Sequence, residues 1–373
     1  MLERTQPPFR ADHVGSLIRP DVLIAARQAA ERDESAAPVL QPIQEQAIRD
    51  VVRMQEELGF RLATDGEFNR TSWQRDFLLR LDNVELIPSK LTVRFHSQAG
   101  TRDHSPPSLQ VVGRLARLRD IFVGDFRLLK SVTRAVPKVT IPSPTVLHFR
   151  GGRGAIDRTA YPDMEAFYAD LARVYAEEIK ALAEAGCRYL QIDEVNLAYL
   201  CDPALRGEVA NIGEDPNALP STYAKLLNDA IAARPSDMVV CLHLCRGNFA
   251  GAWIAEGGYD PIADLLFNQI AVDGYFLEYD TPRAGSFAPL RLMPKGKLAV
   301  LGLVTTKSVR LETKDELKHR IEEASRHVAI EQLALSPQCG FSSAIGGQTM
   351  TIDDEVAKLR LVADTARDVW GTT

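Results

Sequence analysis

The chain has 373 residues, of which 45% are hydrophobic and 25% are charged, a composition typical of a folded globular protein rather than a disordered one. Lys and Arg total 44 against 50 for Asp and Glu, and the resulting net charge of −6 provides no general electrostatic attraction for nucleic acid or an anionic membrane. A small molecule is therefore the expected partner.

Eight short apolar segments alternate with longer segments of helical periodicity. In chain order the predicted strands are FRADHVGS, FRLATDGE, VTIPSP, RYLQIDE, VVCLHLC, GYFLEYD, LAVLGLVTT and LALSPQCGF. Helices are predicted at residues 40–58, 163–185, 221–233, 315–333 and 353–369. The alternation predicts an α/β protein with a (β/α)8 TIM barrel, and no linker or repeat divides residues 1–373 into two domains.

One connection is much longer than the others. Residues 74–137 separate the second and third predicted strands and contain the turn-rich segment RFHSQAGTRDHSPPS. We interpret them as an inserted hairpin or lid within the barrel. The alternative is that this segment only packs against the barrel as a closing hairpin.

The first residues, MLERTQPPFR, lack the apolar core of a signal peptide, and no apolar stretch of about 18 residues could span a bilayer. We therefore expect a cytoplasmic protein without a membrane partner. The five cysteines are an odd number in a large chain, which favours reduced thiols and metal binding over disulfides.

Polar residues follow several of the predicted strands. Ser16 follows the first strand, Glu67 the second and Asp193 the fourth. Active sites of parallel barrels lie at the carboxyl ends of the strands, where separate segments converge. These residues are therefore expected at one rim of the barrel.

Four residues of the types that hold catalytic zinc also fall at strand ends. They are His243, Cys245, Glu278 and Cys339. In the His-x-Cys pair the two side chains leave a strand on the same face, as two ligands of one metal must. A single buried Cys or His is more often part of a core than a ligand, but four of them at strand ends favour a zinc site.

The chain resembles a known family, the cobalamin-independent methionine synthases. It is similar in particular to short members that match the catalytic C-terminal half of the two-barrel enzyme. The matching segments span nearly the whole chain: FRADHVGSLIRP, TDGEFNR, QIDE, HLCRGN, FLEYD, SPQCGFSS and KLRLVADTARDVWG.

The resemblance implies a Zn²⁺ ion bound by His243, Cys245, Glu278 and Cys339. It also implies that homocysteine is held by Ser16, Glu67 and Asp193, and that 5-methyltetrahydrofolate or its polyglutamate donates the methyl group. Zinc would make the substrate thiol available as a nucleophilic thiolate, and the product would be methionine. The alternatives are that Ser16 forms only a turn or helix cap, and that the two carboxylates form ordinary ion pairs.

The chain departs from the family at the proton donor. The two-barrel synthases place a catalytic histidine after the seventh strand, where this chain has Thr305, Thr306 and Lys307. His13 and His148 are the candidate replacements as catalytic general acid. A buried structural role is the alternative for His13.

The chain also lacks the N-terminal barrel beside which the long enzymes bind their folate. The insertion, with Trp73 before it and Phe77 and Phe95 within it, is a candidate cover for the pteridine. Three alternatives remain: a methylated corrinoid on a partner protein as donor, an epoxide opened by a thiol cofactor, and a structural metal in a binding or regulatory barrel.

Overall fold

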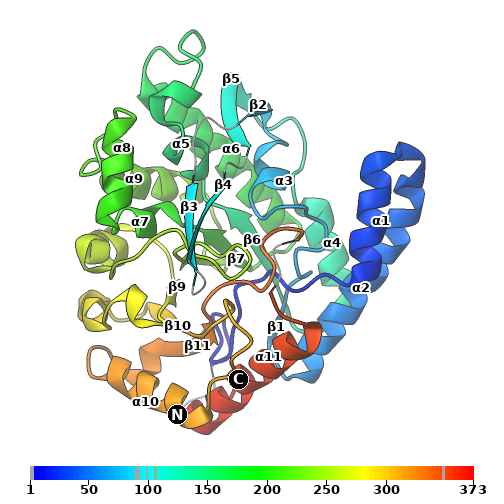
Figure 1. Ribbon diagram of the computed structural model, residues 1–373, viewed down its shortest axis with the longest axis vertical. Coiled ribbons are helices and arrows are strands. Elements are labelled where there is room, and N and C mark those ends of the chain that lie inside the picture. The colour runs from blue at the N-terminus through cyan, green and yellow to red at the C-terminus, as the bar shows by residue number, and fades with distance from the viewer. Residues whose placement is uncertain (1–3, 89–92, 98–99, 105–106, 347–348) are drawn as a thin grey trace.

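The computed structural model describes residues 4–88, 93–97, 100–104, 107–346 and 349–373, and it has a curled parallel sheet surrounded by helices (Figure 1). Seven strands form the sheet in the order β1–β6–β7–β8–β9–β10–β11, and every neighbouring pair is parallel. Their bounds are Leu62–Ala63, Val136–Pro142, Tyr189–Asp193, Val239–Leu244, Gly274–Glu278, Leu298–Val304 and Leu333–Pro337. This order confirms the predicted α/β barrel architecture.

The first predicted strand, FRADHVGS, contributes a single bridge instead of a strand. Ala11 pairs with Leu335 of β11 in parallel fashion. The backbone amides of Phe9 and His13 donate to the carboxylate of Asp12, at 3.3 and 2.8 Å, so they are not used in a strand ladder. The expectation of eight full strands is therefore corrected to seven strands and one bridged segment.

Helices cover the outside of the sheet. The longer ones are α1 Asp21–Arg32, α2 Ala37–Glu57, α4 Val123–Val132, α6 Met164–Glu184, α8 Pro203–Asn211, α9 Leu219–Ile231, α10 Lys314–Ser325 and α11 Ile352–Trp370. The short α-helices are α3 Arg75–Leu78, α5 Val146–Phe149 and α7 Asn196–Tyr199. Short 3-10 helices and one π-helical turn (η4) are η1 Glu34–Ala36, η2 Gly152–Ala155, η3 Asp260–Ile262, η4 Leu265–Gln269, η5 Pro282–Ala284, η6 Ala288–Leu292 and η7 Ile330–Gln332. None of the described helices combines the length and the apolarity needed to cross a membrane.

Helix α6 follows directly from its sequence. The apolar residues that define its predicted inner face are all buried: Phe167, Leu171, Tyr175, Ile179 and Leu182. The Asp163 side chain caps the helix by accepting a hydrogen bond from the amide of Ala166 at 2.9 Å. The chain turns away at Gly186, whose φ of +99° favours glycine.

Helix α10 is shorter than predicted. The sequence pattern predicted a helix over residues 315–333, but α10 ends at Ser325. Leu333 is already the first residue of β11, where it pairs with Ala299 of β10. The chain must leave the helix early enough to enter the sheet, and η7 occupies part of this connection.

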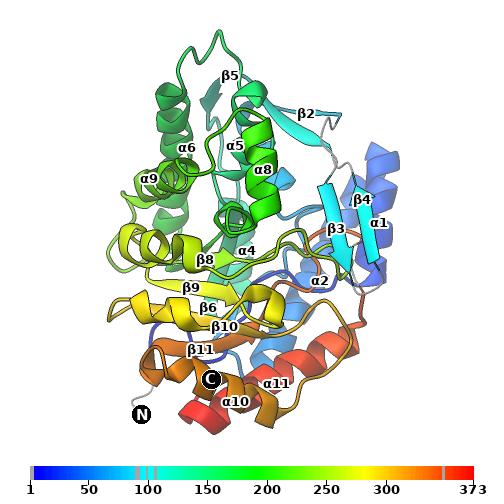
Figure 2. The ribbon, with the colours of Figure 1, turned by 60° about the vertical axis from the view of Figure 1, so that its left-hand side comes forward.

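The predicted insertion contains two antiparallel strand pairs. β2 Asp82–Ile87 pairs with β5 Ser108–Ala116, and β3 Val93–Ser97 pairs with β4 Gly100–His104 between them. Residues 89–92, 98–99 and 105–106 of the predicted insertion lie outside the described residues. In Figure 2 the β3–β4 hairpin lies on the side toward which the strands of the sheet point.

A buried ion pair lies at the amino ends of the strands. Lys138 donates to Asp12 at 2.9 Å, and the Tyr189 hydroxyl donates to the other oxygen of the same carboxylate at 2.7 Å. The Lys138 ammonium also lies 3.9 Å from the ring centre of Phe276. These interactions fill part of the barrel interior at this end.

Candidate metal centre

The end of β8 positions two of the predicted ligands. β8 ends at Leu244, so His243 is its penultimate residue and Cys245 follows it directly. The parallel pairing with β7 places His243 opposite Asp193, the last residue of that strand. Residues from two strands therefore meet at one edge of the sheet.

Cys339 joins this pair from the loop after β11. Its sulfur, the sulfur of Cys245 and a ring nitrogen of His243 all lie within 4.8 Å of one another. All three side chains are buried. The structure thus brings together three of the four residues predicted to bind a metal.

Gly340 allows the Cys339 loop to approach the first segment of the chain. A Cβ atom at Gly340 would lie 1.9 Å from the hydroxyl oxygen of Ser16, which is far inside van der Waals contact. The next residue, Phe341, donates its amide to the carbonyl of Ser16 at 2.9 Å. Ser16 and Cys339 are therefore held side by side by a contact that only glycine permits.

The three side chains fit a zinc ion chemically. Both ring nitrogens of His243 are buried and make no hydrogen bond to any described residue, so the imidazole is free to coordinate. A histidine with two cysteines is a donor set that zinc commonly takes in catalytic sites, where the fourth position stays open.

The electrostatics of the three side chains favour one ionised thiol. A hydrogen bond from Cys339 and contact with His243 lower the pKa of Cys245 well below its usual value. Because Cys339 is the donor in this hydrogen bond, its own pKa is raised well above the usual value. Burial lowers the pKa of His243, but the neighbouring Cys245, Asp193 and Glu278 together outweigh it and the net shift is upward.

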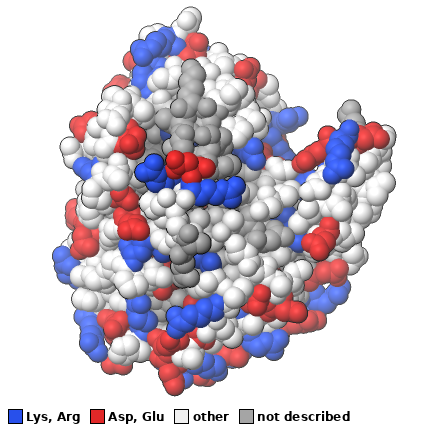
Figure 3. All heavy atoms as spheres, viewed as in Figure 1, with Lys and Arg blue, Asp and Glu red and all other residues white. Residues whose placement is uncertain are grey.

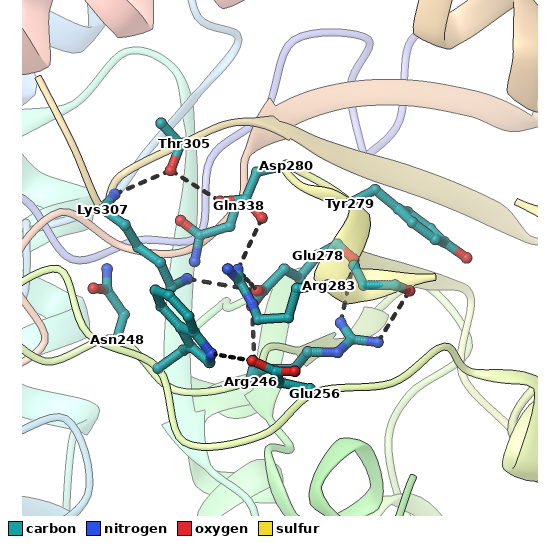
Figure 4. A network of polar contacts seen from close by, with 12 residues as sticks. Arg246, Asn248, Glu256, Glu278, Tyr279, Asp280, Arg283, Thr305, Lys307 and Gln338 are labelled. Carbon is teal, nitrogen blue, oxygen red and sulfur yellow. Dashed lines mark hydrogen bonds and ion pairs between the residues drawn. The ribbon is translucent and has the colours of Figure 1, made fainter. Parts of the chain in front are cut away.

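Glu278, the fourth predicted ligand, is placed differently. It ends β9 and is fully buried, but it is not part of the group of ligand atoms that lie within 4.8 Å of one another. Its carboxylate contacts Arg283 and lies 3.6 Å from the ammonium of Lys307 (Figure 4). Burial would raise the pKa of Glu278, but Lys307, Arg246 and Arg283 together lower it to about 2.

A cavity of about 520 Å³ opens onto these residues. All three members of the cysteine–histidine group line it, and so do Ser16, Glu67 and Asp193. Six of the predicted site residues therefore share the wall of one cavity, whereas Glu278 lies behind it.

Glu67 has one carboxylate oxygen available to a ligand. Its Oε1 accepts a hydrogen bond from the Thr140 hydroxyl at 2.7 Å and lies 3.4 Å from the guanidinium of Arg70. Its Oε2 is buried and has no partner among the described residues. The backbone of Glu67 has φ +61°, a strained conformation for a residue other than glycine. An unpaired buried oxygen on a strained residue is typical of a binding site.

Asp193 supplies a second carboxylate. Its Oδ1 accepts a hydrogen bond from the Gln191 amide at 2.7 Å. Burial raises the pKa of Asp193 to about 7, and the nearby Glu67 adds to this, while His243 acts in the opposite direction. Two buried carboxylates on the wall of one cavity form a suitable site for a cation.

The two predicted general acids do not line the cavity. His13 packs edge-on against Phe60, with ring centres 5.3 Å apart, and burial lowers its pKa to about 3. His148 is hydrogen-bonded at both ring nitrogens, to the hydroxyls of Tyr223 at 2.9 Å and Tyr168 at 3.2 Å. Of the histidines in the described part of the chain, only His243 lines the cavity.

The mouth of the cavity is formed by the predicted insertion and by α1. Trp73, Arg75 and Phe95 line it on one side, and Gln28 and Glu31 of α1 line it on another. The space-filling view shows the surface hollowed between the α1 arm and the body of the molecule (Figure 3). The hairpin is attached to the loop after β8, because the backbones of His96 and Trp253 exchange hydrogen bonds of 2.7 and 2.8 Å.

Sequence reasoning missed several residues that shape the site. Lys307 was considered only because it stands where a histidine was expected, and Arg283 and Arg246 were not considered at all. Arg70, which supports Glu67, lies in the motif TDGEFNR but gave no signal of its own. The useful signal for Lys307 is its place three residues after the end of the buried strand β10, since a charged residue there can face the rim.

Comparison with known proteins gives a consistent result. The profile of the family described as "Cobalamin-independent synthase, Catalytic domain" matches residues 12–367. The uncharacterized protein YxjH of Bacillus subtilis (strain 168) is 43% identical over 371 residues, which cover 99% of this chain and 96% of that protein. The methionine synthase of Pyrococcus abyssi (strain GE5 / Orsay) is 26% identical over 302 residues, which cover 79% of this chain and 76% of that protein.

A solved structure is similar over the whole chain. It is the crystal structure of a Listeria monocytogenes protein proposed to be a vitamin-B12 independent methionine synthase. The TM-score is 0.77 with 36% sequence identity, and 98% of each chain is covered.

Proposed function

Because the chain belongs to the cobalamin-independent methionine synthase family, we propose that it transfers a methyl group to the thiol of homocysteine and so forms methionine. The observation that carries this proposal is the convergence of His243, Cys245 and Cys339 with Glu67 and Asp193 on one cavity. The histidine and the two cysteines suit a metal that activates a thiol, and the two carboxylates suit the ammonium group of an amino acid.

We propose that zinc is held by His243, Cys245 and Cys339. When bound, zinc acts as a Lewis acid that makes the substrate thiol lose its proton and keeps the sulfur nucleophilic at neutral pH. The three side chains converge from two strand ends and stay buried, which excludes bulk water from the sulfur.

The remaining residues orient the amino acid. The unpaired Oε2 of Glu67 and the carboxylate of Asp193 accept hydrogen bonds from its ammonium group. Ser16 lines the same cavity and contacts Gly340 beside Cys339, and in this proposal it lies beside the carboxylate of the amino acid. This arrangement fixes the side-chain sulfur toward the metal ligands.

We propose 5-methyltetrahydrofolate, or its polyglutamate form, as the donor. A sulfur lone pair forms the new S–CH3 bond while the C–N bond to the folate breaks, and the departing nitrogen takes up a proton. Trp73 and Phe95 provide aromatic surface at the cavity mouth for a flat heterocycle. The comparisons lend no support to a corrinoid partner protein as the donor.

The decisive experiment is incubation of the zinc-loaded protein with homocysteine and 5-methyltetrahydrofolate, followed by mass detection of methionine. We expect methionine from the parent protein and none from Cys339→Ser. Cys187→Ser is the matched control, because Cys187 is also buried but does not line the cavity, and its sulfur donates a hydrogen bond to the carbonyl of Tyr189. Equal activity of Cys339→Ser and the parent protein would refute the proposed site.

A further inference from the structure

Two arginines on the cavity wall have no polar partner in the described part of the protein. Arg75 is the first residue of α3, and Arg150 directly follows α5. Both line the cavity and both are half-buried, but neither makes a hydrogen bond or an ion pair with any residue that the structure describes. Their guanidinium groups are therefore available to a ligand.

The other arginines show that this arrangement is unusual. Every other buried or half-buried arginine in the described ranges has a polar partner: Arg117, for example, pairs with Glu178 at 2.7 Å, and Arg70 donates to the carbonyl of Thr140 at 2.7 Å. The remaining described arginines without such a partner, among them Arg158, are exposed to water. A charge that is partly removed from water and left unpaired costs free energy, so a binding role is the better explanation for the two in the cavity.

The carboxylates of the cavity do not neutralise these arginines. Glu31, Glu67 and Asp193 also line the cavity, but none of them forms an ion pair with Arg75 or Arg150. Glu67 and Asp193 are 2% and 5% exposed, whereas the two arginines are more exposed. The wall is therefore negative at its buried end, where the ammonium group of the amino acid is proposed to bind, and positive nearer to the solvent. The anion that the arginines would bind belongs to the second substrate.

We propose that Arg75 and Arg150 bind the two carboxylates of a single glutamate at the tail of the methyl donor. The inference rests on the proposed function, because it assumes a folate donor in this cavity. One glutamate tail carries two carboxylates, which matches the two guanidinium groups, and each pair can form two parallel hydrogen bonds. The described wall of the cavity offers no further lysine or arginine for the carboxylates of a longer tail.

Kinetics provide the first test. Arg75→Gln and Arg150→Gln should each raise the KM for 5-methyltetrahydrofolate about tenfold and leave the KM for homocysteine within about twofold of the parent. Lysine at either position should retain part of the donor affinity, because the charge stays while the planar fork is lost. Arg158→Gln is the matched control, since Arg158 is also unpaired but is exposed and does not line the cavity. A rise in the KM for homocysteine instead would overturn the proposal.

A binding measurement separates charge recognition from the reaction and from folding. The parent protein and the two glutamine variants are titrated by calorimetry with 5-methyltetrahydrofolate and with its diamide, in which both glutamate carboxylates are uncharged. We expect the diamide to bind the parent about 10- to 100-fold more weakly than the donor, and to bind the variants as it binds the parent. Variants that lose equal affinity for both compounds would show a merely structural role and refute the proposal.

The length of the tail provides a further test. We expect the monoglutamate and triglutamate forms of the donor to bind the parent within about threefold of each other, because the additional carboxylates lie in water. A triglutamate that binds more than about tenfold tighter would refute the assignment of a single glutamate.

The outcomes distinguish this inference from the proposed function. If the parent protein binds the donor through the two arginines but forms no methionine, the proposed reaction fails and this inference stands. If it forms methionine and the arginine variants bind the donor as the parent does, only this inference fails. If it does not bind the donor, both fail.

Discussion

Asp193 and His243 are directly paired across the parallel strands β7 and β8, at the point where both strands end. One side chain is a proposed substrate contact and the other a proposed metal ligand. Because neighbouring strands are about 4.8 Å apart, the sheet itself fixes the separation of the two functions. Asp193 and His243 are thus both positioned by strands, whereas Cys339 comes from the loop after β11 and Glu67 from the turn after β1.

Asp193→Asn should weaken homocysteine binding without removing the metal. The amide oxygen of asparagine can still accept the bond from Gln191, but the negative charge facing the ammonium group is lost. We expect the KM for homocysteine to rise about 10- to 100-fold, the effect of one charge-assisted hydrogen bond. Steady-state kinetics and the zinc content of the purified variant measure the two effects separately. A parent-like KM would contradict the assignment.

Glu67→Gln should have a similar effect on KM. The unpaired Oε2 is the feature that points to a ligand, and an amide at this position donates hydrogen bonds where an acceptor is needed. We expect an increase in KM of about 10- to 100-fold. Glu31→Gln is the matched control, because Glu31 lines the same cavity but is exposed. If both variants behave alike, Glu67 does not bind the ammonium group.

Gly340→Ala should destabilise the protein and lower its metal affinity. The added methyl group would lie 1.9 Å from the Ser16 hydroxyl, so the loop that carries Cys339 has to move. We expect a loss of about 2–4 kcal/mol in the free energy of unfolding, measured by urea denaturation. Gly207→Ala serves as the control, because a Cβ there meets no atom within 4 Å.

The Gly340→Ala prediction has an internal check. Ser16→Gly in the same chain removes the hydroxyl that the new methyl group strikes, so part of the stability should return. The double variant should have a higher KM for homocysteine than the parent protein, because Ser16 is also a proposed substrate contact. Equal stability of Gly340→Ala and the parent protein would show that the two loops are not in tight contact.

The stability of the protein should depend on pH through Glu355. This residue of α11 is buried and accepts a bond from the Ile18 amide at 2.8 Å, and burial raises its pKa from 4.5 to about 8. The folded state therefore holds the proton more tightly than the unfolded state. The stabilisation linked to this group is complete below about pH 4.5 and is lost as the pH rises toward 8.

Glu355→Gln should remove this dependence. We expect the unfolding free energy of the variant, relative to the parent, to increase by about 2–4 kcal/mol between pH 5 and pH 8. Urea denaturation at the two pH values gives both numbers. A difference that stays constant across this range would mean that Glu355 ionises normally in the folded protein.

Phe95→Ala should affect the methyl donor more than homocysteine. Phe95 lies on the β3–β4 hairpin, lines the cavity mouth and packs against Phe249 with ring centres 5.8 Å apart. We expect the KM for the donor to rise about tenfold, from the loss of one stacking surface. Leu86→Ala on β2 is the control, because Leu86 is 44% exposed and does not line the cavity. An unchanged donor KM would remove the hairpin from the donor site.

The sequence allowed most of the barrel to be predicted, because buried parallel strands and amphipathic helices carry local patterns. Two failures have different causes. The first strand is reduced to a bridge because the carboxylate of Asp12 takes two nearby backbone amides, a local interaction that hydrophobic periodicity does not report. Helix α10 ends early because Leu333 is needed in the sheet, and this long-range requirement leaves no signal in the local pattern.

The sequence predicts which residues come together when those residues lie at or just after the ends of strands. His243 lies in β8 and Cys245 follows that strand directly, and the rim of the barrel brings Cys339, Glu67 and Asp193 to them. The pairing of Glu278 with Arg283 and Lys307 was not predictable, since it depends on how the loops after two strands fold back.

Gly340 contacts Ser16, so the loop that carries Cys339, a proposed metal ligand, packs tightly against the loop that carries Ser16, a proposed substrate contact. If binding at one site changes the affinity of the other, the two effects are reciprocal: the metal changes the affinity for the amino acid by the same factor by which the amino acid changes the affinity for the metal. Metal occupancy and amino-acid affinity should therefore rise and fall together. On the function proposed above, the metal-free protein would therefore bind the amino acid more weakly, as well as lacking a metal to activate its thiol.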